Sequence, residues 1–369
     1  MAEKLTILDI ARLAGVSTAT VSRVLNEKPD VDPETRERIQ RIMDEHNYVP
    51  NAAASGLAGR RSYMLGALVP SLAWPLLPEL MRGIGEVVGN TVYDLILYSI
   101  ADANHEKDLS DIINRIMGTR LTAGLLAVYP GPSAKHLAKL HSRNFAVVLI
   151  DDQWTPPEGI PWITVDNRGG AYEATRHLIR LGHRRIAHIQ GPLKYQVSHN
   201  RYAGYCDALA EAGIALDPAL VLEGDFTPPS GRLCANAFFD LPAEKRPTAI
   251  FAGSDWMAYG VIAAARQRGL RVPEDIAVVG FDDNLTSAHM EPALTTVRQP
   301  FYDMGCRAAG MLLALVDAAR SAAKGANHNG RVPGASLPMS LESLRINMPT
   351  SLIVRASCGA PSDARTAVE

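Results

Sequence analysis

The sequence lacks several features that would place it in other classes of protein. Its four cysteines lie far apart without metal-ligand spacing, which indicates small buried side chains in a reducing compartment. The beginning of the chain has no apolar core of the signal-peptide type. No apolar run is long enough and free enough of charge to span a bilayer. We therefore expect a cytoplasmic protein with no membrane partner.

Catalytic motifs are also absent from the sequence. It contains no Gly-x-Ser-x-Gly elbow, no phosphate-binding loop and no His-Glu-x-x-His motif. The pair Asp282 and Asp283 has no histidine or further carboxylate at ligand spacing, so we expect no metal site. We predict that the protein is not an enzyme and uses no cofactor.

An excess of positive charge is missing too. The formal net charge of the 369 residues is −2, and residues 1–62 carry nine Lys or Arg against nine Asp or Glu. A basic domain therefore cannot be inferred, and any affinity for nucleic acid must come from where individual arginines stand. The composition, 47% hydrophobic and 21% charged, is typical of a globular protein with two or three domains.

The most informative stretch, residues 6–26, predicts two short helices joined by a tight turn. Thr6 and Asp9 have the spacing of a capping box, in which a hydroxyl accepts from a backbone amide and a carboxylate reaches back. Gly15 can take the left-handed conformation that ends a helix, and Ser17 is a good cap for the next one.

The second of these helices has two different faces. Val21, Val24 and Leu25 fall on one side and predict contact with a core. The opposite side carries small polar groups and one arginine: Ala19, Ser22, Arg23 and Asn26. Such a helix fits a DNA major groove, although the same spacing also suits an ordinary helical hairpin.

The motif around this turn resembles the helix-turn-helix of the LacI/GalR family of transcription regulators. The matching residues are Ala-Gly-Val-Ser at 14–17 and Thr-Val-Ser-Arg-Val-Leu-Asn at 20–26. The resemblance implies that the partner is double-stranded DNA with an inverted-repeat operator. It also implies that Thr18 and Ala19 contact base edges and that Arg23 contacts a base or a phosphate. Phosphate contacts that set the register are implied for Thr6, Ser17, Ser22 and Asn26.

A third helix is predicted from the cap and proline at 32–33 to about His46, which closes a headpiece at residues 5–49. The next segment, 50–61, is alanine-rich but contains Gly56 and Gly59. Composition alone favours a flexible linker. The family resemblance implies instead a hinge helix that forms when two copies pair over the minor groove. Leu57 is then the side chain that wedges between base pairs.

From residue 62 onwards, short apolar runs alternate with helical stretches in two successive series. This pattern predicts an α/β fold of doubly wound parallel sheets in two lobes, with a cleft beyond the carboxyl ends of the strands. We expect an effector-binding and dimerisation domain at 62–358, similar to periplasmic binding proteins. Its lobes are expected at about 62–164 with 297–320, and at about 165–294 with 348–358. We also expect a surface loop at 317–347 with a short helix at 340–346, a last strand at 348–357 and a frayed tail at 359–369.

Residues at the ends of the predicted strands form the candidate effector site. They combine aromatic rings with charged groups, which suits a polyhydroxylated ring. The set is Trp74, Tyr129, Asp151, Tyr195, Arg201, Phe226, Asp255 and Asp282. The resemblance implies that Arg201 and Asp282 are the cleft arginine and aspartate, and that Phe226 stacks on the effector. Trp74 is either a stacking surface or part of the core, and structural caps remain an alternative for Tyr129, Asp151 and Tyr195.

Taken together, the sequence predicts a homodimeric DNA-binding regulator, a repressor, that responds to a small molecule. A sugar is the expected effector, and a nucleobase-type co-repressor is the alternative. Two other classes remain in view: a non-regulatory sugar-binding protein, and an enzyme on a doubly wound fold. The sequence does not indicate whether the effector releases the protein from DNA or promotes its binding.

Overall fold

The computed structural model describes residues 5–25, 28–48, 62–99, 106–119, 121–128, 134–151, 159–329 and 345–361. The chain divides into two units, Met1–Ser62 and Tyr63–Glu369, each with its own core. None of the helices in these ranges combines the length and apolarity that a bilayer span requires.

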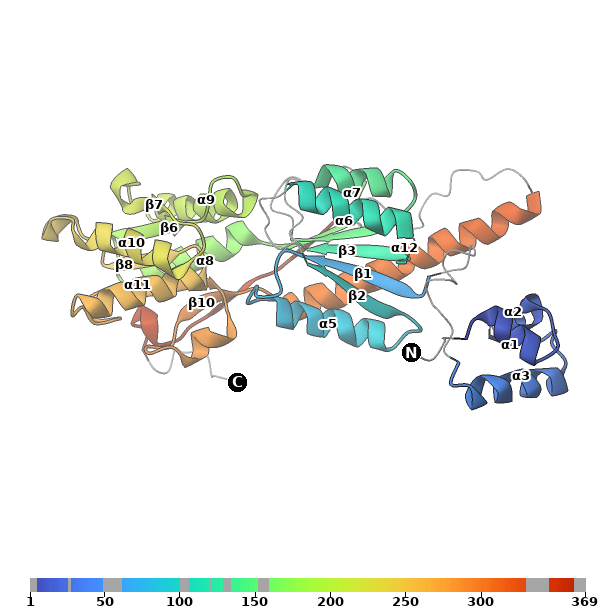
Figure 1. Cartoon of the computed structure of the whole chain (residues 1–369). Coiled ribbons are helices and arrows are strands. Elements are labelled where there is room, and N and C mark those ends of the chain that lie inside the picture. Colours follow the sequence, from blue (N-terminus) through green and yellow to red (C-terminus); the bar gives the residue numbers. More distant parts are fainter. Residues whose placement is uncertain are drawn as a thin grey trace. The chain divides into compact units, whose positions relative to one another are not determined.

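The first unit is a three-helix headpiece built from α1 (Ile7–Leu13), α2 (Thr18–Leu25) and α3 (Pro33–Glu45) (Figure 1). Its core is formed by Ile10, Val21 and Ile39, one from each helix, and all three are fully buried. Gly15 has a φ of 66° and ends α1, as the sequence predicts. The exposed face of α2 is therefore fixed by the burial of its other face.

The helix caps of the headpiece follow the sequence. At α1 the Thr6 amide and the Thr6 hydroxyl both donate to the Asp9 carboxylate. The Thr6 side chain also accepts from the Asp9 backbone amide, so both hydrogen bonds of the predicted capping box are present. Donation from Thr6 holds the pKa of Asp9 below its usual range. At α3 the Asp32 carboxylate accepts from the Thr35 amide, as expected for a cap.

The second unit contains two six-stranded sheets, which confirms the predicted two-lobed α/β fold. The first has the order β11-β5-β4-β3-β1-β2 and only parallel neighbours. Its strands are β1 (Met64–Val69), β2 (Asp94–Ser99), β3 (Gly124–Val128), β4 (Ala146–Ile150), β5 (Trp162–Val165) and β11 (Arg345–Met348). Its helices are α5 (Leu77–Gly89), α6 (Glu106–Thr119), α7 (Ala134–His141) and α12 (Phe301–Asn329).

The second sheet has the order β12-β10-β9-β8-β6-β7, with β12 alone running antiparallel to its neighbour. Its strands are β6 (Ile186–Gln190), β7 (Val221–Glu223), β8 (Ala249–Ala252), β9 (Ala277–Asp282), β10 (Thr295–Arg298) and β12 (Ser351–Ile353). Its helices are α8 (Asn167–Arg180), α9 (Gln196–Glu211), α10 (Pro228–Phe239) and α11 (Asp255–Gln267).

Each sheet buries both faces, because alternate residues of a strand enter different cores. On β3, Leu126 belongs to the core under α5 and α12, whereas Leu125 belongs to the core under α6 and α7. On β8, Ile250 packs toward α10 and α11, and Phe251 packs toward α8 and α9. Apolar runs without polar alternation are the expected sequence of such strands.

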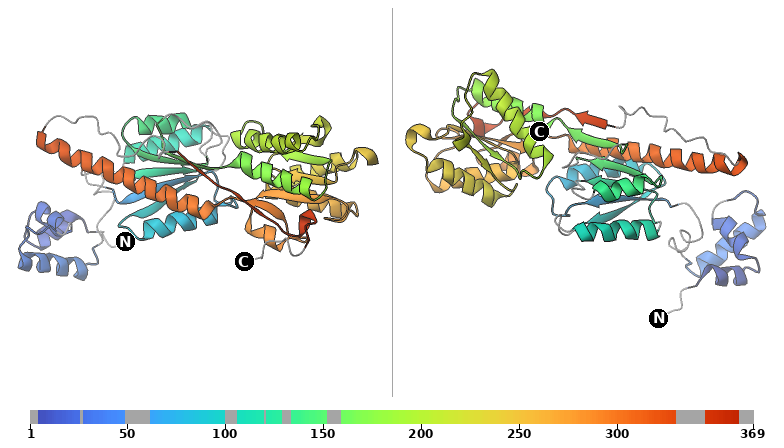
Figure 2. Two further views of the ribbon diagram at one scale, coloured as in Figure 1. Left: turned by 180° about the vertical axis from the view of Figure 1, so that it is seen from behind. Right: turned by 90° about the horizontal axis from the view of Figure 1, so that it is seen from above.

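The end of the chain departs from the expected single last strand at 348–357. Figure 2 shows this red segment passing from one lobe to the other. β11 pairs with β5 in the first sheet, and β12 pairs with β10 in the second. β10 itself lies in the second sheet, so the chain re-enters the first lobe after Arg298 and not at residue 297.

The segment predicted as a surface loop at 317–347 is also different. α12 continues to Asn329, and β11 begins at Arg345. Residues 345 and 346 of the predicted short helix are therefore in a strand. At the end of the chain, Ala360 is only 1% exposed, so the tail does not begin at residue 359. Three predicted contact residues, Asn26, Leu57 and Tyr129, lie outside the described residues, as does the predicted hinge helix at 50–61.

Helices α10 and α11 pack with their backbones in direct contact, and this contact generates a prediction. A methyl group at Gly260 would overlap the Pro228 carbonyl oxygen. We expect Gly260→Ala to cost about 2 kcal/mol and to lower the melting temperature by about 5 °C. The control is Gly310→Ala on α12, where nothing lies within 4 Å. It should be neutral or slightly stabilising. Equal melting temperatures for the two variants would contradict this packing.

Candidate functional site

The candidate effector site is built around Arg201, which is almost completely buried. Arg201 lies on α9 and is 4% exposed. Its Nε donates to Asn167 Oδ1 over 2.9 Å, and its NH1 donates to the Gly253 carbonyl oxygen over 2.6 Å. The guanidinium lies 3.7 Å from the Phe281 ring centroid. Its position is thus set by α8, by the end of β8 and by β9.

Asp282, the last residue of β9, lies beside this guanidinium. Its Oδ1 is 3.7 Å from Arg201 NH1 and accepts a hydrogen bond of 2.7 Å from Gln299 Nε2. Burial raises the pKa of Asp282, and the charge of Asp151 acts in the same direction. Arg201 and Gln299 oppose this rise by stabilising the carboxylate. The structure thus brings Arg201 and Asp282 together, and both side chains are largely shielded from solvent.

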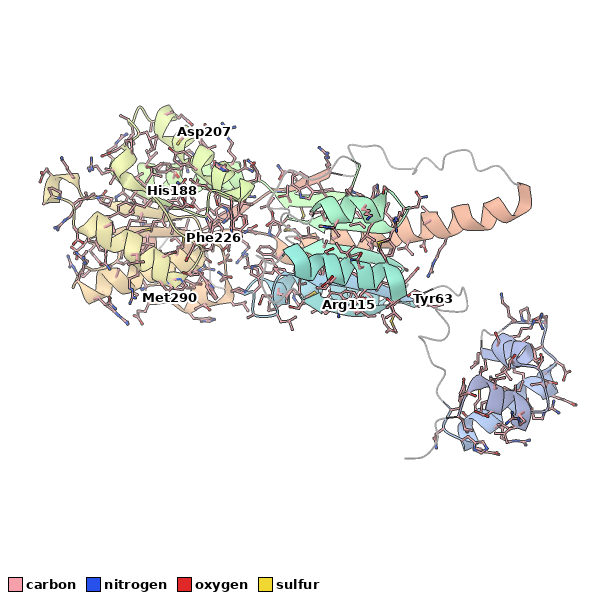
Figure 3. The ribbon with its side chains drawn as sticks, turned by 45° about the horizontal axis from the view of Figure 1, so that its top comes forward. Tyr63, Arg115, His188, Asp207, Phe226 and Met290 are labelled. Atoms are coloured by element: carbon pink, nitrogen blue, oxygen red, sulfur yellow. The ribbon has the colours of Figure 1, made fainter. Side chains whose placement is uncertain are left out.

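An aromatic platform adjoins this setting. Phe226 follows β7 and stacks on Tyr195, with ring centroids 6.2 Å apart and an interplanar angle of 17°. Gly191, at the end of β6, leaves room for the Phe226 ring, because a methyl group there would overlap the ring. Figure 3 labels Phe226 on the side of the second lobe toward the first. Both rings are half-buried, so each keeps a surface that a ligand can cover.

Unusual backbone conformations concentrate at these strand ends. Among the described residues, six other than glycine have positive φ, and four of them lie here: Asp151, Phe226, Asp282 and Asp283. Positive φ is costly for residues with a Cβ and persists where the surroundings impose it. Such strain is commonly found at ligand sites.

Asp255 differs from its expected place as a ligand contact. It is fully buried, and its side chain accepts from the Asn284 amide, the Ser287 hydroxyl and the Thr296 hydroxyl. Burial, helped by the charge of Asp282, raises the pKa of Asp255. The side chain therefore belongs to a buried polar cluster with Asn284, Ser287 and Thr296, next to the end of β9 that carries Asp282.

The two described candidates from the first lobe have structural partners. Trp74 is half-buried and packs edge-on against Phe301, with ring centroids 5.8 Å apart. Asp151 is fully buried, and its Oδ1 accepts from the Thr164 hydroxyl over 3.1 Å. Trp74 thus packs against the core, and Asp151 contacts the neighbouring strand β5 through Thr164.

Two polar residues of this site were not among the sequence candidates. Asn167 holds Arg201, and Gln299 holds Asp282. The Gln299 Oε1 atom is buried and has no hydrogen-bond partner in the described part of the chain. Gln299 precedes Pro300 at the crossing between lobes, and that placement was the available signal. The described residues contain no group of His, Cys, Asp and Glu that could hold a metal ion.

The headpiece presents the second candidate surface on α2. Ala19 and Arg23 are exposed, whereas Thr18 and Ser22 are partly buried. Arg23 Nε lies 3.4 Å from Asp30 Oδ2, so the guanidinium is oriented along the surface by an acidic neighbour. The Ser17 hydroxyl accepts from the Thr20 amide and caps α2, which also keeps it at the exposed amino end of that helix.

Comparisons with known proteins agree with this architecture. Residues 6–51 match the model of bacterial regulatory proteins of the lacI family, and residues 175–337 match a periplasmic binding protein-like domain. The chain is 37% identical to catabolite control protein A of Priestia megaterium over 308 residues, which cover 83% of this chain and 91% of that protein.

Solved structures give the same result. The lac repressor dimer bound to operator and the anti-inducer ONPF matches 97% of this chain and 100% of its own, with a TM-score of 0.78 and 29% identity. The transcriptional regulator CelR in complex with cellobiose covers 96% and 99%, with a TM-score of 0.68 and 31% identity. These relatives are regulators, which confirms that the chain is not an enzyme. The chain belongs to the LacI family of bacterial regulatory proteins and is a DNA-binding transcriptional regulator.

Proposed function

We propose that this protein is a homodimeric repressor, acting in the cytoplasm, that binds an inverted-repeat operator and is controlled by a sugar in the cleft of its effector domain. The single observation that carries the proposal is the ion pair between the buried Arg201 and Asp282, at the strand ends where Phe226 and Tyr195 also stack. The test is whether a sugar that binds this cleft also changes operator affinity.

Operator binding is assigned to the exposed face of α2. Thr18 and Ala19 stand at the amino end of this helix, where a recognition helix contacts base edges. Ala19 offers only a methyl group, which suits a thymine methyl. Arg23 supplies the charge, with Thr6, Ser17 and Ser22 as phosphate contacts. Because charges of the headpiece balance, we infer modest affinity for each half-site, so two subunits must bind together.

The cleft chemistry favours a sugar because a sugar has apolar ring faces and polar edges. The stacked Phe226 and Tyr195 rings suit a face. Arg201 and Asp282 suit hydroxyl groups, since a guanidinium donates and a carboxylate accepts. The unpartnered Gln299 Oε1 provides a further acceptor. The solved complex of CelR with cellobiose supports the same class of ligand.

Asp255 is assigned a positioning role instead of ligand contact. Its side chain accepts from the Asn284 amide and the Ser287 hydroxyl, in the segment that follows Asp282. Its own amide donates to Asp282 and lowers the pKa of that carboxyl. Asp255 therefore sets where Asp282 stands, and a change at Asp255 acts on the effector through Asp282.

Control of DNA binding follows from a difference in affinity between two states. An effector shifts the equilibrium only as far as it prefers one arrangement of the lobes over the other. A tenfold change in operator affinity requires a preference of about 1.4 kcal/mol. We propose that the segment at 50–61 is where this difference acts, because it joins the headpiece to the effector domain.

The cleft assignment predicts the behaviour of Arg201→Lys. Lysine keeps the charge but cannot reproduce the fixed fork of donors, so we expect at least about tenfold weaker effector binding. A thermal-shift screen of sugars and nucleobases on the wild type supplies the ligand, which is then titrated into both proteins. Operator affinity without ligand should change little. The control is Arg168→Lys, a solvent-exposed arginine paired with Asp207. Equal responses of wild type and Arg201→Lys would reject the site.

The environment of Asp255 predicts a pH dependence of stability. Because burial raises its pKa in the folded state, folding favours the protonated form, and stability is lost as the pH rises above about 4. Asp255→Asn mimics the protonated form. Its melting temperature should fall less than that of the wild type between pH 5 and pH 8. Asp240→Asn, at an exposed residue paired with Arg268, is the control and should behave like the wild type. An unchanged pH dependence in Asp255→Asn would contradict the assignment.

The hinge assignment predicts the effect of Leu57→Ala. If Leu57 wedges between base pairs, its removal weakens operator binding by at least about tenfold and leaves binding to unrelated duplex DNA unchanged. Fluorescence anisotropy with both DNAs measures the two affinities. Leu72→Ala, at a leucine of the effector domain that is 62% exposed, is the matched control. Equal losses on both DNAs would mean that the segment serves only as a tether.

A further inference from the structure

Helix α12 runs along the first lobe from the carboxyl ends of the strands to their amino ends. It begins at Phe301, which contacts Trp74 beyond the carboxyl end of β1, and it follows Gln299, which binds Asp282. Nineteen residues later it reaches Arg320, about 28 Å farther at 1.5 Å per residue. It packs along α5 and crosses β3, β4 and β5 on the way (Figure 1). Helix α12 therefore connects the carboxyl ends of these strands to their amino ends.

At the amino ends of the strands, Arg320 lies against two tyrosine rings. Its guanidinium carbon is 5.2 Å from the Tyr63 ring centroid and 4.9 Å from the Tyr93 ring centroid. The two rings are themselves in contact, with centroids 6.1 Å apart. A guanidinium at such distances is attracted to both rings by a cation–π interaction. We call Arg320, Tyr63 and Tyr93 the tyrosine clamp.

The clamp is anchored in the sheet. Tyr63 and Tyr93 directly precede β1 and β2, and the Asp94 amide donates to the Tyr63 carbonyl oxygen over 2.8 Å. Tyr93 is 8% exposed, and burial raises the pKa of its hydroxyl. Tyr63 is 51% exposed and is the first residue of the second unit (Figure 3). Arg320 thus ties a half-exposed ring to a buried one.

We propose that Arg320 is a positioning residue for operator binding, which fixes the point where the segment at 50–61 leaves the effector domain. This inference rests on the proposed function, because it assumes that this segment connects two headpieces to one operator. It adds a residue of α12 that touches neither DNA nor effector.

The physical reason is preorganisation. Two headpieces reach both half-sites of an operator only if their connecting segments start from defined positions. When the start is loose, ordering it on DNA costs additional entropy, and specific binding weakens. Binding to unrelated DNA does not require the two half-sites to be in register, so it does not bear this cost.

The experiment compares full-length variants with a symmetric operator selected from random duplexes and with an unrelated duplex of equal length. Arg320→Ala should bind the operator about tenfold more weakly than the wild type, and bind the unrelated duplex within about twofold. Arg307→Ala, at an exposed arginine of the same helix, is the control and should match the wild type on both DNAs. Tyr63→Phe keeps the ring and should also match, whereas Tyr63→Leu should show the loss.

Hydrogen exchange separates positioning from general destabilisation. In Arg320→Ala, amide exchange should rise at residues 62–65 of the free protein, while exchange in β3 and β4 stays as in the wild type. The Tyr63→Leu variant repeats the test if Arg320→Ala does not fold. Operator affinity within twofold of the wild type in both variants overturns the proposal, as does an equal loss on both DNAs. If the wild type itself does not prefer any inverted repeat, the proposed function fails first.

Discussion

The desolvated ion pair between Arg201 and Asp282 is the constraint on which the second lobe depends. Removing charges from water is costly, and hydrogen bonds offset this cost: Arg201 donates to Asn167 and Gly253, and Asp282 accepts from Gln299. Removing either Arg201 or Asp282 would leave the other charge without its partner, which is unfavourable away from water. The hydrogen-bond partners that hold the two charged groups come from three different parts of the second lobe. The stacked rings of Phe226 and Tyr195 lie at the ends of strands of the same sheet, and we propose that a polyhydroxylated ligand complements both the pair and the rings.

The same site is linked mechanically to the first lobe through the crossing at 298–301. Gln299 binds Asp282 and is followed after one residue by Phe301, the first residue of α12. Asp283, next to Asp282, pairs with Arg298 and with Arg355, which lie on two neighbouring segments of the second lobe. A ligand that changes the position of Asp282 therefore acts on groups that control where α12 begins. In this way a local change at one edge of the sheet can reach the residues that precede β1.

The sequence predicted features that depend on local patterns. The two faces of α2, the turn at Gly15 and the apolar strands follow from spacing and composition, and the structure has them. It failed where long-range pairing decides, as for β11 and β12, which look like one strand but enter different sheets. The burial of Asp255 and the roles of Asn167 and Gln299 also depend on neighbours far away in the chain. The length of α12 was missed because a segment rich in glycine, serine and asparagine hides its end.

The central claim is that one cleft and one DNA surface share a free energy of coupling. It is tested most directly by measuring sugar affinity with and without operator, and operator affinity with and without the same sugar, on the full-length protein. Thermodynamic linkage requires both affinities to change by the same factor. The account predicts equal factors, of about tenfold or more. A sugar that binds with the same affinity whether or not operator is present would contradict it.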